Sequence, residues 1–185
     1  MATSSYSPMQ KTLHWLTFLL IIGLYGLALA EDLFERGDPG RAMVWWLHIS
    51  FGLMLAVMVA ARLGLRLTRG APDLPASMAG HERALAHLTH IGLYGLMIAL
   101  PLLGIVLTWL RGDTLTFFGL FTIPAPFAPD RALGRTVKEI HELAANLILA
   151  LAALHTAAAL WHHHVRRDDV LKRMMPGSRA EVVEG

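Results

Sequence analysis

The stretch that decides the fold is Lys138–His164, KEIHELAANLILALAALHTAAALWHHH. It contains about 20 mostly apolar residues in a row, the length that a helix needs to cross the hydrocarbon core of a bilayer. Two histidines, His141 and His155, stand fourteen residues apart within it. On an α-helix this spacing is a rise of about 21 Å and nearly four turns, so both rings face one side at two depths. The stretch therefore predicts a membrane-spanning helix with two inward-facing imidazoles.

Three further stretches have a similar length and apolar character, so the sequence predicts an all-α integral membrane four-helix bundle. The chain of 185 residues is 55% hydrophobic and only 16% charged, against roughly 25% charged residues in an ordinary globular domain. Such a composition excludes a disordered chain. The four spans leave no room for a second domain, and we expect residues 1–185 to form one transmembrane domain. The expected spans are residues 13–30, 44–61, 87–110 and 140–161.

The absence of cysteine limits the chemistry of the protein. With no cysteine there is no disulfide, no thiolate-bound zinc or iron–sulfur cluster, and no covalent C-x-x-C-H haem attachment. The sequence also has no phosphate-binding glycine loop and no dinucleotide fingerprint. We therefore expect no nucleotide cofactor and no nucleic-acid partner. The four apolar spans predict membrane lipid around the chain.

The basic residues predict how the chain crosses the membrane. If both termini and the middle connection share one side, that side carries ten Lys and Arg residues and the other side carries six. Positively charged loops favour the cytoplasmic face. We expect both termini in the cytoplasm.

Ionisable residues inside a span are costly and usually functional. At the outer depth the sequence places His48, in the second span, and His141. At the inner depth His155 has three possible partners at a similar level: His14, His87 and His90. Two axial imidazoles hold haem b and leave no open position on the iron, which suits electron transfer. Each histidine alone would also fit an interfacial or carbonyl-bonded role, but the pattern as a whole predicts two stacked haems b.

Five stretches carry a resemblance to a known family. They are LHWLTFLL at Leu13–Leu20, LHISFGLMLAVMVAARLGLRL at Leu47–Leu67, LAHLTHIGLYGLMIALPLLGIV at Leu85–Val106, the stretch at Lys138–His164 quoted above, and LKRMMP at Leu171–Pro176. Together they cover nearly the whole chain, and the sequence resembles the bacterial di-haem cytochrome b-561 family. The resemblance is closest to the members that oxidise superoxide.

The resemblance implies a four-helix protein of the bacterial inner membrane with two haems b. It implies that His48 and His141 ligate the outer haem iron, and His14 and His155 the inner one. Superoxide would be oxidised at the periplasmic face and its electron passed through both haems to ubiquinone. Related cytochromes relay electrons from a dehydrogenase partner to quinone, which is the alternative function. An exposed apolar patch around Phe117 to Phe121 would favour that alternative.

Lys138 is the candidate residue for attracting superoxide. It precedes His141 by three residues and lies on nearly the same helix face. A positive charge there would raise the local concentration of a small anion. A lysine at a span boundary is also explained by snorkelling into the headgroup layer.

The candidate ubiquinone residues are His162 and Trp15. His162 follows His155 by seven residues, close to the same face, and Trp15 adjoins His14. A histidine there could orient the quinone and deliver a proton. A basic cluster held against lipid phosphates is the competing explanation. The sequence assigns no role to the remaining histidines, which are His81, His87, His90, His163 and His164.

Overall fold

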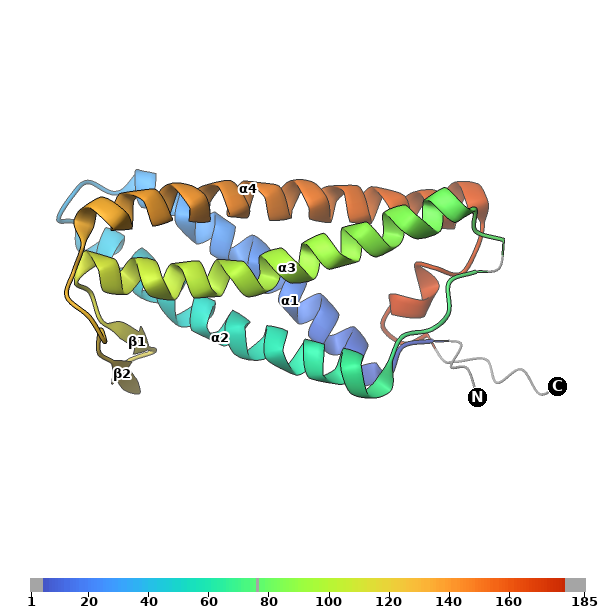
Figure 1. Cartoon of the computed structure of the whole chain (residues 1–185), viewed down its shortest axis with the longest axis horizontal. Helices are drawn as coiled ribbons and strands as arrows, with labels where there is room; N and C mark the ends of the chain where they lie inside the picture. The colour runs from blue at the N-terminus through green and yellow to red at the C-terminus, as the bar shows by residue number, and fades with distance from the viewer. Residues whose placement is uncertain (1–4, 76, 179–185) are drawn as a thin grey trace.

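The computed structural model describes residues 5–75 and 77–178, and the expected domain of residues 1–185 extends past these at both ends. Four long helices run side by side in an antiparallel bundle (Figure 1). They are α1 (Pro8–Ala30), α2 (Pro39–Arg69), α3 (Gly80–Arg111) and α4 (Arg131–Trp161). All four are long and apolar enough to cross a membrane, so the predicted bundle of four spanning helices is confirmed.

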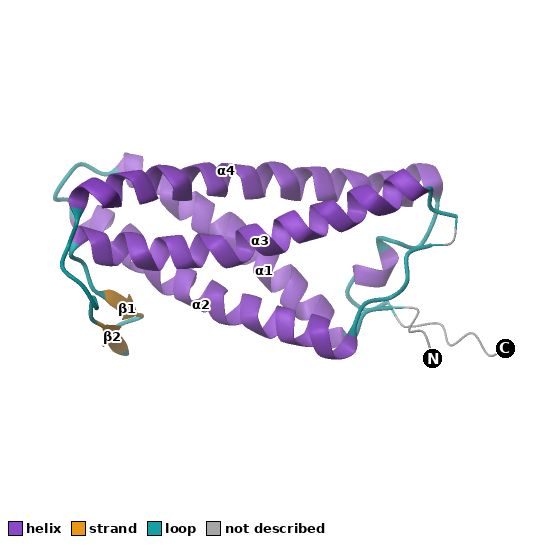
Figure 2. Ribbon diagram, viewed as in Figure 1, coloured by secondary structure: helices purple, strands orange, loops and turns teal. Residues whose placement is uncertain are grey.

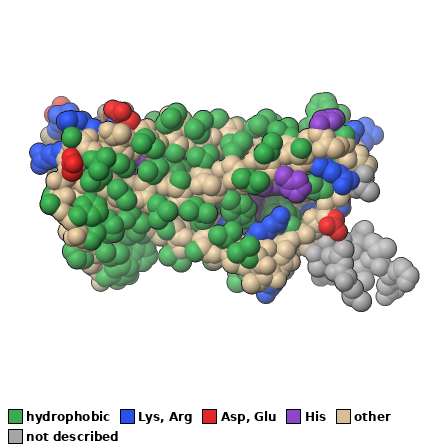
Figure 3. Space-filling view, viewed as in Figure 1, with side chains coloured by type: hydrophobic (Ala, Val, Ile, Leu, Met, Phe, Trp, Pro, Cys, Tyr) green, Lys and Arg blue, Asp and Glu red, His purple; other side chains and the backbone are tan. Residues whose placement is uncertain are grey.

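The helices form two closely packed pairs, α1 with α2 and α3 with α4. Their shared core lies in the middle of the bundle. It consists of Leu24, Leu55, Val59, Met97, Leu100, Ala144 and Ile148, with partly buried apolar side chains packed around it. Figure 3 shows hydrophobic side chains over much of the length of the bundle, with acidic groups at its two ends. This distribution suits a molecule surrounded by lipid.

Every helix is longer than the span predicted from the apolar residues. The helix α2 continues through Arg66 and Arg69 and ends at Gly70, which has a φ of 68°. Basic side chains in a last turn complement the helix dipole, so charge does not end the helix there. The helix α4 begins well before its apolar part because Asp130 accepts hydrogen bonds from the backbone N–H groups of Ala132 and Leu133. The apolar pattern marks the embedded part of a helix, and the capping residues set its ends.

A β-hairpin interrupts the connection between α3 and α4, where the sequence predicted only a loop covering the membrane surface. The strand β1 (Leu115–Phe117) pairs antiparallel with β2 (Phe121–Ile123). Phe118 and Gly119 turn the chain with φ values of 48° and 74°. The hairpin is the only sheet among the described residues, and it lies beside α2 (Figure 2).

The two ends of the bundle are named here by what they carry. The hairpin end holds the β-hairpin and the short 3-10 helix η1 (Glu31–Leu33). The terminal end holds the start of α1 and the end of α4. After α4 the chain makes a π-helical turn, η2 (His162–Arg166), and a 3-10 turn, η3 (Lys172–Met174). The segment that carries η3 folds back beside the start of α1, where the indole N–H of Trp15 donates to the carbonyl of Met174 (Figure 1).

Candidate functional site: two histidine pairs

At the hairpin end, α2 and α4 bring His48 and His141 together. Their ring centres are 6.4 Å apart and the ring planes differ by 65°. Nδ1 of His48 lies 3.1 Å from the backbone carbonyl oxygen of Leu24. A carbonyl only accepts, so Nδ1 carries the proton and donates it, which leaves the lone pair of this ring on Nε2. Metal-binding histidines are commonly oriented by a hydrogen bond of this kind.

At the terminal end, α1 and α4 bring His14 and His155 together with the same separation. Their ring centres are 6.4 Å apart and their planes differ by 63°. Nη2 of Arg62, from α2, lies 3.3 Å from Nδ1 of His14. The two pairs therefore repeat one ring-centre separation at two levels of the bundle. Their Nδ1 contacts differ, because a guanidinium only donates and Nδ1 of His14 therefore accepts from Arg62.

The separation within each pair is that expected for two imidazoles on opposite sides of one metal ion. A metal–imidazole bond is about 2 Å long and a ring centre lies roughly 1 Å beyond its nitrogen, so the two centres should be about 6 Å apart. His90 also approaches His155, but with a ring-centre distance of 5.2 Å. The spacing therefore fits His14 better than His90 as the partner of His155.

The hairpin-end pair faces a cavity of about 890 Å³, within the range of roughly 300–1,000 Å³ typical of ligand sites. Gly52 and Gly104 line it. A Cβ at Gly52 would meet no atom within 4 Å, and a Cβ at Gly104 would lie 3.4 Å from Cε1 of His141. Nδ1 of His141 is buried without a hydrogen-bond partner among the described residues. The open space against Gly52 and the two imidazoles that face the cavity fit a large planar group held by these rings.

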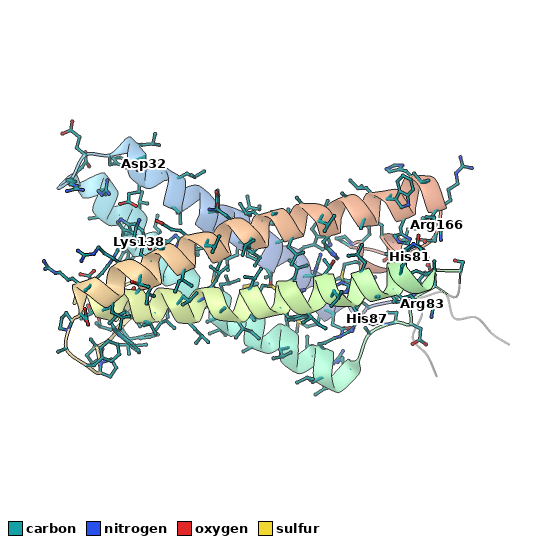
Figure 4. The ribbon with its side chains drawn as sticks, turned by 45° about the horizontal axis from the view of Figure 1, so that its top comes forward. Asp32, His81, Arg83, His87, Lys138 and Arg166 are labelled. Carbon is teal, nitrogen blue, oxygen red and sulfur yellow. The ribbon has the colours of Figure 1, made fainter. Side chains whose placement is uncertain are left out.

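A smaller cavity of about 490 Å³ opens at the terminal end beside His90 and His87. Tyr6, Arg66 and Arg83 also line it. Burial raises the pKa of the Tyr6 hydroxyl, and the neighbouring Arg66 partly offsets this by favouring the charged form. His87 and Arg83 lie near each other at this end (Figure 4). The cavity is predominantly basic, and sequence reasoning did not identify it.

The two candidate quinone residues both contact the segment that follows α4. Nδ1 of His162 lies 2.6 Å from Oδ2 of Asp168. The indole N–H of Trp15 donates to the backbone carbonyl of Met174, at 3.0 Å. Trp15 also contacts His14, with ring centres 5.4 Å apart. The sequence did not predict the contact of Asp168 with His162, because only the π-helical turn brings a residue six positions further on back to this histidine.

The other three histidines at the tip of the terminal end have different neighbours. His163 and His164 contact each other, with ring centres 4.8 Å apart. His81 lies near Arg166 at the tip of the bundle (Figure 4). Arg166 forms an ion pair with Glu82.

Lys138 lines the same cavity as His141 but is not a free cation. Its Nζ forms an ion pair of 2.5 Å with Glu142. Arg111 lines this cavity too, with its guanidinium 5.5 Å from the ring centre of Trp45. Among the described residues Arg111 has no carboxylate partner. Arg111 is therefore the less compensated positive charge beside His141, and the sequence did not distinguish it from the other loop arginines.

The model of the prokaryotic cytochrome b561 family matches residues 5–177, which include all four helices and both histidine pairs. The chain belongs to the prokaryotic cytochrome b561 family. Cytochromes of this family are haem-binding helical bundles that transfer electrons in the membrane, and the haem is of the b type. The predicted family, fold and cytochrome b character are thereby confirmed.

Curated relatives span nearly the same length. A protein named cytochrome b561 homolog 1 from Escherichia coli K12 is 32% identical over 171 residues, covering 92% of this chain and 97% of that protein. A probable superoxide oxidase, CybB, from Yersinia pestis is 35% identical over 177 residues, covering 94% and 97%. A cytochrome b562 from Cereibacter sphaeroides is 29% identical, covering 92% and 94%. The chain is thus similar over nearly its whole length to family members with differing names.

Proposed function

We propose that this cytochrome oxidises periplasmic superoxide and reduces ubiquinone, with two haems b held by His48 and His141 and by His14 and His155. The observation that carries the proposal is the repeated 6.4 Å separation of two imidazole pairs at two levels of one bundle. When bound, each haem would supply a reversible one-electron centre without an open coordination position. The similarity to a probable superoxide oxidase supports superoxide as the donor.

The protein also has a proposed location and orientation in the cell. We assign residues 1–185, as one domain, to the bacterial inner membrane with both termini in the cytoplasm. The excess of Lys and Arg at the terminal end supports this orientation. The hairpin end, with His48 and His141, is then periplasmic and open to superoxide.

At the periplasmic end the residues of the chain have to attract a small anion. Lys138 and Arg111 both line the cavity of His141. The ion pair with Glu142 compensates much of the charge of Lys138. Carboxylates of Glu31, Asp32 and Asp113 also line the cavity, so the attraction is confined to the surroundings of Arg111. A focused positive potential raises the encounter rate of an anion with the site.

At the cytoplasmic end His162 orients the quinone and delivers protons, and Trp15 provides an aromatic wall beside His14. Two superoxide ions each release one electron as dioxygen forms. Ubiquinone takes up these two electrons and two protons and becomes ubiquinol. His162 is suited to this proton transfer because its ring is fixed by Asp168 and an imidazole has one nitrogen that donates and one that accepts.

The test is a purified holoprotein with its b-type difference spectrum. We expect two haems per chain, haem reduction by an enzymatic superoxide source, and formation of ubiquinol after ubiquinone is added. Superoxide-dependent reduction should disappear when superoxide dismutase is present. If two haems are bound but superoxide leaves them oxidised, the chain is instead a relay from a dehydrogenase partner to quinone.

A further inference from the structure

The hairpin and the loop that follows it form an apolar surface at the hairpin end. Residues 115–128, LTFFGLFTIPAPFA, contain no charged residue and no histidine. Four of the side chains are substantially exposed: Leu120 by 76%, Phe121 by 52%, Phe127 by 44% and Ile123 by 39%. We call these four residues the hairpin patch. Exposed apolar surface of this kind marks a contact with a protein partner or with a membrane.

The backbone of the hairpin is held at a defined level of the bundle by Ser50 of α2. This serine is completely buried. Its hydroxyl donates to the carbonyl of Thr116, at 3.1 Å, and accepts from the N–H of Phe118, at 3.0 Å. The ring of Phe118 packs on Phe51, with ring centres 5.1 Å apart. The hairpin is thus fixed beside α2.

Ser50 lies within the part of α2 that is expected to be embedded in the membrane. Ser50 is two residues beyond His48 and four beyond Trp46, which is about 6 Å further along the helix than the tryptophan. Tryptophans gather where lipid headgroups meet the acyl chains. Trp46 also contacts Phe118, with ring centres 5.8 Å apart. The hairpin therefore lies just inward of a tryptophan that marks the boundary.

Lipid fits this surface better than a soluble protein does. Protein interfaces surround their apolar centre with a polar rim, whereas fourteen successive residues here lack any charge. Figure 3 shows a continuous hydrophobic surface where the hairpin joins the flank of the bundle. A two-stranded sheet has unpaired edges that cannot enter the hydrocarbon centre. Its depth is therefore limited to the boundary of one leaflet.

We propose that the hairpin patch inserts into the boundary between lipid headgroups and acyl chains in the leaflet at the hairpin end. Leu115 and Thr116, at the base of the hairpin, line the cavity that contains His48 and His141. Anchoring the tip in lipid holds this base against the opening of the cavity. The apolar patch, expected above to favour a dehydrogenase partner, is assigned to lipid instead.

The absence of cysteine makes a direct test simple. A spin label on Leu120→Cys is compared with labels on Val57→Cys and Glu35→Cys, in the full-length holoprotein reconstituted alone in phosphatidylethanolamine–phosphatidylglycerol nanodiscs. Val57 is a 71% exposed residue of α2 and reports lipid. Glu35 is exposed in the charged connection at the hairpin end and reports water. The experiment measures how strongly each reagent relaxes the spin label. Dissolved oxygen reports exposure to lipid, and a water-soluble nickel chelate reports exposure to water.

We expect the Leu120 label to favour oxygen over nickel, as the Val57 label does. A nickel accessibility equal to that of the Glu35 label would overturn the proposal. A Leu120 label that the nickel chelate reaches in the nanodiscs but not in native membranes would also overturn the proposal. That result would indicate a protein partner. Phe121→Cys provides a second position if Leu120→Cys lowers the yield of holoprotein. Accessibility is independent of superoxide activity, so failure of the proposed function would not affect this result.

Discussion

The imidazole of His162 is held by the carboxylate of Asp168, with 2.6 Å between Nδ1 and Oδ2. Both side chains are largely buried, with 12% and 16% exposed. The other carboxylate oxygen of Asp168 accepts the N–H of Val170, at 3.1 Å. The N–H of Asp168 donates to the carbonyl of His162, at 3.2 Å. These contacts orient the ring through Nδ1 and do not involve Nε2.

Replacing Asp168 with asparagine should impair ubiquinone reduction by about tenfold, less than the roughly 10²–10⁴-fold that general acid–base catalysis contributes, because the imidazole itself remains. The amide preserves the shape of the side chain but removes the negative charge that favours a proton on Nδ1. The measurement is kcat and KM for ubiquinone across a pH series, with haem reduction by superoxide followed separately. We expect the kcat–pH profile to change while haem content and haem reduction stay constant.

The matched control is Asp169→Asn, because Asp169 is exposed and pairs only with Arg173 among the described residues, at 2.9 Å. It should leave the quinone kinetics unchanged. Equal pH profiles for the Asp168 variant and the wild-type protein would show that the carboxylate has no part in proton delivery.

Replacing His14 with alanine should remove the terminal-end haem, whereas replacing His90 should leave both haems bound. The reason is the 6.4 Å separation of His14 from His155, compared with 5.2 Å for His90. The haem-to-protein ratio and the b-type difference spectrum measure the outcome. Loss of a haem in the His90 variant alone would reassign the ligand.

Gly52→Leu should exclude the haem at the hairpin end. A Cβ at this position would meet no atom within 4 Å, so the new side chain would extend into the cavity of His48 and His141, which Gly52 lines. The haem-to-protein ratio should fall from two to one. Gly64→Leu is the control, because Gly64 lies exposed on the same helix with nothing within 4 Å. Full haem content in the Gly52 variant would mean that the open space serves another purpose.

Arg111→Gln should slow superoxide oxidation by about two- to fivefold at low ionic strength, because a local positive potential is lost. Salt should reduce the difference, since mobile ions screen the attraction between the half-buried arginine and the approaching anion. Lys138→Ala should have a smaller effect because Glu142 already compensates its charge. Stopped-flow haem reduction at several salt concentrations measures both variants. Arg131→Gln, at an exposed position outside the cavity, is the control, and an equal loss there would indicate only a general charge effect.

Ser50→Ala should destabilise the packing of the hairpin by about 1–3 kcal/mol, the cost of leaving buried hydrogen-bonding groups unsatisfied. The groups affected are the carbonyl of Thr116 and the N–H of Phe118. Protection of the Phe118 amide from hydrogen exchange measures the change. Thr68→Ala, which removes an exposed hydroxyl bonded within its own helix, should leave this protection unaltered.

Much of the bundle could be predicted from the chain because the signals are local. Apolar stretches predicted four spanning helices, and the structure contains four such helices. The ends were predicted too short, since caps such as Asp130 lie outside the apolar stretches. The hairpin was missed because it depends on Ser50, which is 66 residues away from Thr116. No pattern within either segment reveals that contact.

The sequence by itself determined the membrane class, the family motifs and the two depths of the histidines. A rise per residue and an angle per residue are constant along a helix, so the spacing of His141 and His155 needs no tertiary information. Only the tertiary structure decided which rings face each other across helices, because that depends on how the helices are rotated and packed. It also decided that Asp168 reaches His162, that Glu142 compensates Lys138, and that the apolar hairpin lies beside α2. These are contacts between separate segments or irregular turns, and their energy comes from packing that no single stretch of sequence specifies.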